Sequence, residues 1–202
     1  YNPKPRIVFG STFFVNGNVD KLPVDMNSPC NPLGLYPATK LAAEHFCHIY
    51  YNLFDLNITI ARFTNVFGPF EKSNNKKKAG FNFIINQAVK GEEIQIYNNG
   101  NFIRDYIYVE DVADACVTLA EKGETNKVYY VGRGEFTKFR KLIDIIEEQI
   151  PNTKIKIIEP PEFHKKVGIT NFVCDNSDLK KLGWTPKFSL EEGIRKTIDF
   201  YK

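Results

Sequence analysis

The sequence predicts an α/β fold built on a parallel sheet, and three neighbouring segments carry this prediction. Residues 6–10 and 57–62 are short apolar or β-branched runs, which is typical of buried strands. Residues 37–54 lie between them and have the pattern of one long helix. Because a strand, a helix and a second strand joined by a long crossover form a parallel pair, we expect both strands in one parallel sheet.

The helix over residues 37–54 is expected to begin at Pro37 and to pack against the core. Proline suits the first helical position, because its missing N–H has no helical partner there. Apolar residues then recur at helical spacing, which predicts that one stripe of the helix faces a core. The stripe comprises Ala42, Phe46, Ile49 and Leu53.

Tyr36 and Lys40 stand four residues apart at the start of this helix. Residues at that spacing share one face, one turn apart, so the phenol and the ammonium group are expected to project together. A neighbouring ammonium group stabilises a phenolate, and such a tyrosine can act as a general base on a sugar or alcohol hydroxyl. The alternative is coincidence, because a pattern of two residues is short.

The remainder of the chain alternates predicted strands and helices. Glu110 and Asp111 place acidic side chains in the first turn of a helix, where the positive end of the helix dipole favours them. Residues 189–192 (Ser-Leu-Glu-Glu) form a capping box that opens the last helix. Further helices are expected over residues 81–89, 136–149 and 177–182, and further strands over residues 92–97, 104–109, 127–131 and 154–158.

Composition places the protein among globular chains. Its 202 residues suffice for one sizeable core, and 43% of them are hydrophobic. No stretch approaches the roughly 18 apolar residues that cross a membrane. A net charge of +3 is too small to indicate nucleic acid as a partner. We therefore expect neither a membrane segment nor nucleic-acid binding.

The four cysteines are scattered, and none belongs to a C-x-x-C pair. This spacing predicts neither a zinc site nor a disulfide framework, and the three histidines also lack ligand spacing. Free thiols suit a reducing compartment, so the cytoplasm is the predicted location and no metal is expected. The cysteines are Cys30, Cys47, Cys116 and Cys174.

Polar residues follow both predicted strands at the ends where parallel sheets bind ligands. Ser11 and Thr12 come directly after the first strand, and Thr64 and Asn65 lie just past the second. In open α/β sheets, ligands bind outside the carboxyl ends of the strands. These residues, together with Tyr36, predict a ligand site at that edge.

Five stretches carry a resemblance that covers nearly the whole chain. They are residues 7–12 (Ile-Val-Phe-Gly-Ser-Thr) with 15–17 (Val-Asn-Gly); 36–44 (Tyr-Pro-Ala-Thr-Lys-Leu-Ala-Ala-Glu); 62–69 (Arg-Phe-Thr-Asn-Val-Phe-Gly-Pro); 104–113 (Arg-Asp-Tyr-Ile-Tyr-Val-Glu-Asp-Val-Ala); and 182–186 (Leu-Gly-Trp-Thr-Pro) with 189–193 (Ser-Leu-Glu-Glu-Gly). In this order and spacing they resemble the extended short-chain dehydrogenase/reductase family, specifically its NAD-dependent nucleotide-sugar epimerases and dehydratases. The resemblance implies a partial Rossmann-type doubly wound parallel sheet with a smaller α/β substrate domain.

The resemblance also implies NAD as the cofactor and gives roles to residues at the predicted ligand edge. Tyr36 would take the proton from a sugar hydroxyl, and Lys40 would bind the nicotinamide ribose and support Tyr36. Thr12 would hydrogen-bond the reacting oxygen, where a group already in place helps at the transition state. Ser11 and Thr64 would lie beside the cofactor. The implied catalytic residues are therefore Thr12, Tyr36 and Lys40, and the implied cofactor-binding residues are Ser11, Tyr36, Lys40 and Thr64.

A nucleotide-diphosphate sugar is the implied substrate. Arg104 resembles the clamp on the diphosphate, since a guanidinium can bind phosphate through two bonds. The alternative for Arg104 is an ordinary ion pair with Asp105 or Asp111. Lys165 or Lys166 stands where many relatives have a second arginine, so that contact would be a point charge. The remaining implied substrate-binding positions are Thr12, Asn65, Gly80, Phe81, Gln95 and Tyr97.

Departures from the family pattern shape the expected activity. Phe13 and Phe14 stand where related dehydratases and decarboxylases carry acidic residues. This favours an epimerase that oxidises and reduces C4 through a keto intermediate. Asn16 replaces a common tyrosine, which predicts nothing by itself. The sequence contains no G-x-x-G-x-x-G turn for the cofactor pyrophosphate, so we expect a carboxyl-terminal portion that alone binds NAD weakly and has little activity.

On the family's layout, residues 1–69 and 103–133 complete the NAD-binding domain, and residues 70–102 and 134–202 form the nucleotide-sugar-binding domain. Two other functions stay open. One is a dehydratase, decarboxylase or reductase of the same family. The other is a non-catalytic binding or assembly subunit, because a half-built sheet exposes an edge and apolar helix faces. Relatives commonly dimerise through the long helix after Tyr36, so a homodimer is expected.

Overall fold

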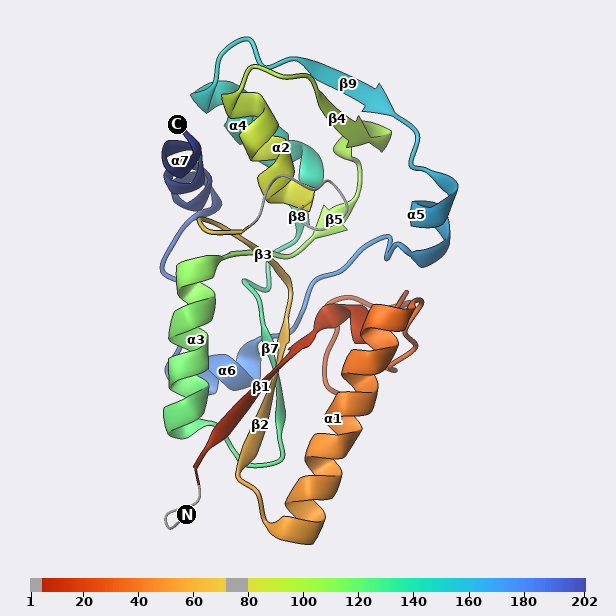
Figure 1. The fold of residues 1–202 in the computed structure, drawn as a ribbon, viewed down its shortest axis with the longest axis vertical. Coiled ribbons are helices and arrows are strands. Elements are labelled where there is room, and N and C mark those ends of the chain that lie inside the picture. The colour runs from red at the N-terminus through yellow and green to blue at the C-terminus, as the bar shows by residue number, and fades with distance from the viewer. Residues whose placement is uncertain (1–4, 72–79) are drawn as a thin grey trace.

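The computed structural model describes residues 5–71 and 80–202, and it confirms an α/β fold with a parallel sheet (Figure 1). Strands β1 (Ile7–Thr12), β2 (Ile58–Phe63) and β7 (Val128–Val131) lie in the order β1-β2-β7, and both neighbouring pairs are parallel. In the register, Phe63 lies between Thr12 on one side and Val131 on the other. The carboxyl ends of the three strands therefore lie side by side.

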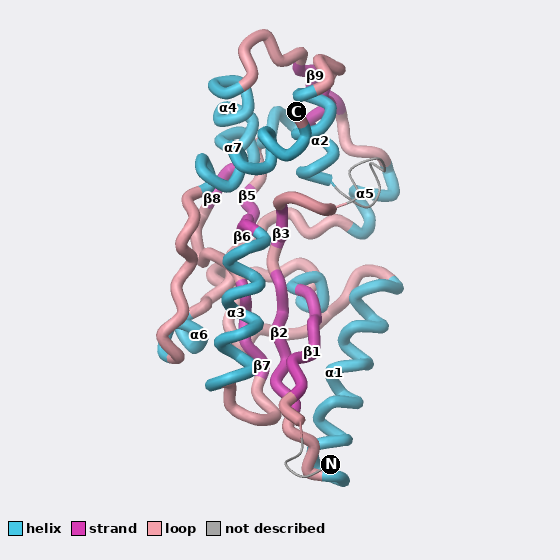
Figure 2. Tube along the Cα trace, turned by 60° about the vertical axis from the view of Figure 1, so that its left-hand side comes forward, coloured by secondary structure: helices cyan, strands magenta, loops and turns pink. Residues whose placement is uncertain are grey.

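Helices cover both faces of this sheet. α1 (Leu35–Phe54) packs on one face and α3 (Val109–Lys122) on the other, with the strands between them (Figure 2). All four residues of β7 and most of β2 are accordingly buried. Burial on both faces explains why β7 is apolar without alternation along its length.

The predicted orientation of α1 is wrong. Of its apolar stripe, Phe46 is 60%, Ile49 47% and Leu53 68% exposed, whereas the buried residues of the helix are Pro37 and Glu44. The physical reason is an ion pair: Glu44 turns toward β2, where Arg62 is buried, and this draws the polar face of the helix inward. The apolar stripe consequently faces away from the sheet.

The start of α1 also differs from the prediction, because the helix begins at Leu35 with Gly34 as its N-cap. Pro37 is thus the third helical residue rather than the first. The first N–H groups of a helix lack helical partners, so proline is tolerated there as well. The earlier start places Tyr36 inside the first turn of the helix.

A second group of elements lies beyond the carboxyl ends of the sheet (Figure 1). The predicted strand over residues 104–109 is interrupted at Asp105, whose carboxylate is buried among main-chain N–H groups. The short strands here form three pairs: β3 (Asn65–Phe67) with β6 (Tyr106–Tyr108) and β4 (Ile94–Tyr97) with β9 (Ile155–Ile158), both parallel, and β5 (Ile103–Arg104) with β8 (Thr137–Lys138), antiparallel.

Three helices pack around a separate hydrophobic core in this second group. Predicted apolar residues of the helix at 136–149, such as Leu142 and Ile146, are buried, and the capping box is present between Ser189 and Glu192. Both predictions are confirmed. The helices are α2 (Gly80–Val89), α4 (Phe139–Gln149) and α7 (Leu190–Tyr201); the shorter ones elsewhere are η1 (Phe13–Asn16), η2 (Asn98–Gly100), α5 (Glu162–Val167) and α6 (Ser177–Lys181).

The hydrophobic residues fall into distinct clusters. One cluster joins α2, α4 and α7, and another joins β2, β7 and α3. A third, smaller cluster contains Phe13 and Phe172. The predicted boundaries at residues 69, 102 and 133 stay a prediction, and part of the 70–102 segment lies outside the described residues.

Candidate functional site

A cavity of about 980 Å³ lies at the carboxyl ends of β1 and β2, bounded on its other sides by α2 and β4. Its size is at the upper end of the range for ligand pockets in proteins. The structure brings most of the predicted site residues to its wall. These are Ser11, Thr12, Tyr36, Thr64, Asn65, Gly80, Phe81, Gln95 and Tyr97.

Tyr36 and Thr12 bring hydroxyl groups to this cavity from two different elements. Tyr36 is 57% exposed and belongs to the first turn of α1. Thr12 is buried at the end of β1, and its Oγ1 accepts a hydrogen bond from the N–H of Phe14 at 3.4 Å. Accepting this bond uses one lone pair and leaves the Thr12 hydroxyl able to donate its proton.

Lys40, Arg104 and Lys165 make their contacts elsewhere than at the cavity wall. Lys40 Nζ donates to the carbonyl oxygen of Gly10 at 2.8 Å and lies 5.2 Å from the ring centroid of Phe9. These contacts fasten α1 to β1, one turn of helix beyond Tyr36. The prediction that the Tyr36 phenol and the Lys40 ammonium group project together stays a prediction.

Arg104 donates hydrogen bonds to main-chain carbonyls. Its guanidinium contacts the oxygens of Ile169 and Thr170, and its centre lies 5.1 Å from the ring centroid of Phe102. Burial lowers the pKa of Arg104, although Tyr106 opposes this change. The two carboxylates considered as alternative partners, Asp105 and Asp111, accept hydrogen bonds from main-chain N–H groups.

Lys165 lies on α5, where it forms an ion pair with Glu162 at 3.0 Å. The hydrogen bond from Lys165 to Glu162 raises the pKa of this lysine. Its neighbour His164 does line the cavity, with its ring centroid 5.5 Å from that of Tyr97. Sequence reasoning missed His164. The signal that could have identified it is its position next to Lys165 and Lys166, which match a substrate-binding position of the family.

Asn65 owes its position at the cavity to Asp105. Its main-chain N–H and its side-chain Nδ2 both donate to the carbonyl oxygen of Asp105 at 3.0 Å. The carboxylate of Asp105 accepts from the N–H groups of Arg133 (2.9 Å) and Gly134 (3.0 Å), and from the buried Cys174. Burial raises the pKa of Asp105. One residue thus joins β6, the loop after β7 and the segment at 174.

The turn at Gly68 brings β3 and the start of α2 together. Asn82, buried on α2, accepts from the N–H of Gly68 at 3.2 Å and donates to its carbonyl at 2.6 Å. Gly68 has a φ of 144°, and a Cβ atom there would lie 2.5 Å from Val109 Cγ1, so the turn requires glycine. The two bonds hold the end of β3 against α2, whose first residues, Gly80 and Phe81, line the cavity.

Aromatic side chains form much of the remaining wall, and sequence reasoning identified few of them as site residues. Such rings provide flat apolar surface for a base or a sugar face. No local motif marks them, because they come from strands and helices far apart in the sequence. They are Phe13, Phe14, Phe63, Phe83, Phe102, Tyr106 and Phe139.

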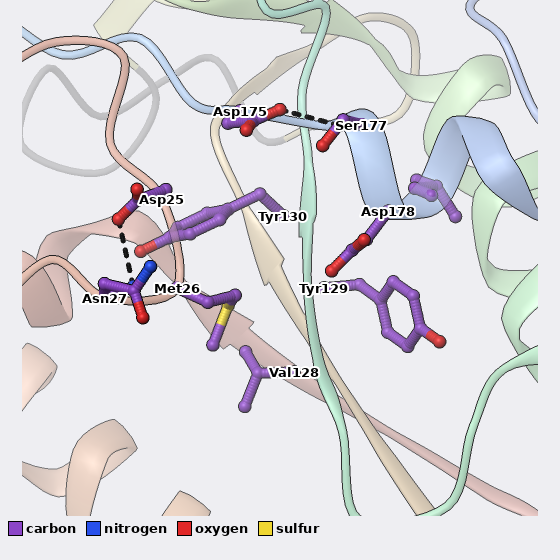
Figure 3. Close-up of a pocket in the computed structure, with 10 residues that line it drawn as sticks. Asp25, Met26, Asn27, Val128, Tyr129, Tyr130, Asp175, Ser177 and Asp178 are labelled. Atoms are coloured by element: carbon purple, nitrogen blue, oxygen red, sulfur yellow. Dashed lines mark hydrogen bonds between the residues drawn. The ribbon is translucent and has the colours of Figure 1, made fainter.

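A smaller cavity of about 180 Å³ lies beside β7 and shares no residue with the first (Figure 3). Asp25 accepts a hydrogen bond from the N–H of Asn27 at 2.9 Å, and Asp175 accepts one from Ser177 at 2.8 Å. These carboxylates serve local turns, so we assign no chemistry to this cavity.

Within residues 5–71 and 80–202, no three or more histidine, cysteine or acidic side chains are grouped to hold a metal ion. None of the helices in these two ranges has the length and apolar character to cross a membrane.

The doubly wound sheet with a ligand cavity at its carboxyl edge defines a Rossmann-like α/β protein. Residues 1–132 match the family model described as the NAD dependent epimerase/dehydratase family. The chain belongs to this family, which confirms the resemblance found in its motifs.

Relatives extend beyond the length of this chain. It is 32% identical over 192 residues to the UDP-glucose 4-epimerase of Mycolicibacterium smegmatis, covering 93% of this chain and 59% of the relative. The solved UDP-glucose 4-epimerase of Thermotoga maritima with UDP-glucose has a TM-score of 0.87 and 29% identity, covering 97% of this chain and 63% of that one. The solved complex of the Thermus thermophilus UDP-glucose 4-epimerase with NAD has a TM-score of 0.85 and 28% identity, covering 98% of this chain and 64% of that one. The chain thus spans about three fifths of the length of these relatives.

Proposed function

We propose that the protein containing this chain is an NAD-dependent nucleotide-sugar epimerase that inverts C4 of the sugar through a keto intermediate. The observation that carries the proposal is that Tyr36 and Thr12 line the same cavity, with Phe13 and Phe14 directly after Thr12. Elimination needs an added acid or base at that place, and two phenylalanines supply neither. Reversible oxidation needs only a base and a hydrogen-bond donor at the reacting oxygen.

The residues at the wall suit both parts of this chemistry. Tyr36 takes the proton from the C4 hydroxyl and returns it, and Thr12 donates a hydrogen bond to the same oxygen. Lys40 holds α1 against β1 and supports Tyr36. A nicotinamide dinucleotide, when bound, accepts hydride from C4 and gives it back. Ser11, Tyr36, Lys40 and Thr64 are the residues that would hold its nicotinamide end. Ser11, Tyr36 and Thr64 line the cavity at the sheet edge, and Lys40 is bonded from α1 to the β1 strand that carries Ser11.

The substrate in this proposal is a nucleotide-diphosphate sugar. Asn65 offers its side-chain oxygen and the second N–H of Nδ2, because one N–H donates to the carbonyl oxygen of Asp105. Arg104 would exchange its carbonyl partners at Ile169 and Thr170 for the diphosphate, with Lys165 nearby on α5. The base and phosphates would lie among Gly80, Phe81, Gln95 and Tyr97, which line the far side of the cavity.

We also propose a homodimer formed through the exposed stripe of α1. Phe46, Ile49 and Leu53 present adjacent apolar side chains to solvent on one face of this helix. A contiguous apolar face of this kind typically marks a protein–protein contact. The four free cysteines fit the proposed cytoplasmic setting.

The test is product analysis with the full-length gene product that contains these 202 residues. UDP-glucose is incubated with the enzyme and NAD, and the sugar nucleotide is followed by NMR and mass spectrometry. The expected product is the C4 epimer at unchanged mass. Loss of water would instead identify a dehydratase. A parallel reaction with UDP-glucuronate, which has a carboxyl group, would identify a decarboxylase through loss of carbon dioxide. Stoichiometric NAD binding without conversion of any nucleotide sugar would favour the non-catalytic subunit.

A further inference from the structure

A line of buried hydrogen bonds runs from the cavity wall into the molecule. Ser11 Oγ, at the end of β1, lies 2.5 Å from Oε1 of Glu44 on α1. Glu44 in turn accepts two bonds from Arg62 on β2, from Nε at 3.0 Å and from Nη2 at 2.7 Å. All three side chains are almost completely excluded from solvent. Ser11 is the member of this line that also borders the cavity.

The chemistry of these groups fixes the direction of each bond. A guanidinium has donors and no acceptor, so Glu44 must be the acceptor in its pair with Arg62. A carboxylate held in this way can only accept from Ser11, so the Ser11 proton points to Glu44. The lone pairs of Ser11 are then left for the cavity. Thr12, whose oxygen accepts from Phe14, keeps its proton and can donate it.

We propose that Glu44 is a positioning residue that holds Ser11 as a hydrogen-bond acceptor toward the bound ligand, beside Thr12 as a donor. The ligand group that meets Ser11 is accordingly a donor, such as a hydroxyl or an amide N–H of the dinucleotide or of the sugar. This inference rests on the proposed function of the cavity. It makes Ser11 an acceptor at this wall, beside Thr12, which can donate.

The far end of the line keeps Arg62 in place. Arg62 Nη1 donates to the hydroxyl of Tyr130 at 3.1 Å, and Tyr130 donates to Oδ1 of Asn16 at 2.8 Å. Asn16 then donates from Nδ2 to the carbonyl oxygen of Pro29 at 3.1 Å. The asparagine that departs from the family pattern therefore completes a buried network, at a distance from the cavity wall.

Glu44→Gln tests the polarity. Oε1 of Glu44 accepts from both Ser11 and Arg62 Nε, and Oε2 accepts from Arg62 Nη2, so the amide N–H₂ of glutamine opposes one Arg62 donor in either orientation. With the N–H₂ at the Oε1 position, Ser11 must accept from glutamine and turn its proton to the cavity. In the full-length gene product, we expect Glu44→Gln to weaken binding about tenfold for the ligand that donates to Ser11. Calorimetry with NAD alone, and with UDP-sugar added to the NAD-loaded protein, shows which of the two ligands is affected.

Ser11→Ala separates the effect of the Ser11 hydroxyl on ligand binding from any effect on the Glu44–Arg62 pair. It removes the hydroxyl but leaves the bonds between Glu44 and Arg62, and we expect a similar loss of affinity for the same ligand. In the Ser11→Ala background, Glu44→Gln should add little further loss, because its effect passes through the missing hydroxyl. Tyr130→Phe is the matched control: it shortens the network at its far end and should leave both affinities unchanged. Circular dichroism verifies folding of each variant.

Unchanged affinities for both ligands in Ser11→Ala would overturn the proposal, and this result decides the matter even if Glu44→Gln fails to fold. Equal losses from Glu44→Gln with and without the Ser11 hydroxyl would also overturn it. Failure of the epimerase proposal is distinguishable, because it appears as NAD binding by the wild-type protein without sugar conversion. The binding comparison among variants stands apart from that result.

Discussion

Lys40 Nζ on α1 lies 2.8 Å from the carbonyl oxygen of Gly10 on β1, to which it donates a hydrogen bond. One turn further along the same helix, Glu44 forms its ion pair with Arg62 on β2. Two consecutive turns of α1 are therefore fastened to two neighbouring strands. Tyr36 belongs to the turn before them, so its phenol is carried by an element whose position is fixed at two points.

Replacement of Tyr36 by phenylalanine should abolish turnover while leaving stability intact. The phenol is the proposed base, and general-base catalysis contributes about 10² to 10⁴ in rate. Because the side chain is more than half exposed, its hydroxyl contributes little to folding. We expect a loss of at least about 100-fold in kcat with an unchanged Tm. Tyr50→Phe, on an exposed position of the same helix, is the control, and retention of a tenth of the activity in Tyr36→Phe would contradict the assignment.

Lys40→Met should raise the Kd for NAD and lower kcat together. The substitution keeps most of the apolar stem but removes the hydrogen bond to Gly10, and with it one attachment of α1 to β1. A net loss of about 1.5 kcal/mol in stability is expected, at the lower end of the range for a bond to a charged group, because Lys40 is half-buried. NAD titration and urea unfolding measure the two effects. Lys90→Met, at an exposed lysine just after α2, should change neither quantity.

Loss of Arg62 should destabilise the fold strongly. Arg62→Met leaves the Glu44 carboxylate buried without its cation, and such a change costs about 3–5 kcal/mol. Replacing both partners, as in Glu44→Leu with Arg62→Met, should cost less than the single change, since no unpaired charge remains. Urea denaturation of the two single variants and the double variant gives the coupling. Strictly additive costs would contradict a coupled pair.

Stability should fall at high pH through Tyr130. Burial raises the pKa of Tyr130 from 10.0 to about 12, against the lowering influence of Arg62. In the unfolded chain the phenol ionises near its usual pKa, while in the folded protein it stays protonated. The stabilisation is therefore complete below pH 10 and is lost as the pH rises toward 12. By pH 11.5 the loss relative to Tyr130→Phe should reach on the order of 2 kcal/mol, measured by urea unfolding at each pH. If the free energy of unfolding changed with pH in the same way in the wild type and in Tyr130→Phe, this role of Tyr130 would be disproved.

Much of the fold follows from local patterns in the sequence. The strands at 58–63 and 128–131 have continuous β-branched and aromatic runs, and Ser189 and Glu192 have the spacing of a capping box. Each of these signals depends on residues close together in the chain. The break at Asp105 depends instead on N–H groups at 133, 134 and 174, which no local pattern reveals.

The candidate site shows the same division. Ser11, Thr12, Tyr36 and Thr64 lie where strand ends and one helix start place them, so motif and topology sufficed to bring them to one cavity. His164 and the partners of Arg104 lie on a segment whose path across the cavity is set by tertiary packing. The prediction of which face of α1 is buried was wrong for a similar reason. The pattern of apolar residues contained no information about Arg62, the buried partner of Glu44.

The burial of Glu44 and the exposure of the apolar stripe on α1 have a consequence for redesign of this protein. A hydropathy-guided scheme would place leucine at 44 and lysine or glutamate at 46, 49 and 53, expecting a tighter interior and a more soluble exterior. The first change would leave the guanidinium of Arg62 buried without its carboxylate partner. The others would remove the apolar surface that we propose for the dimer contact. For α1, polarity alone predicts the wrong face of the helix as the buried one.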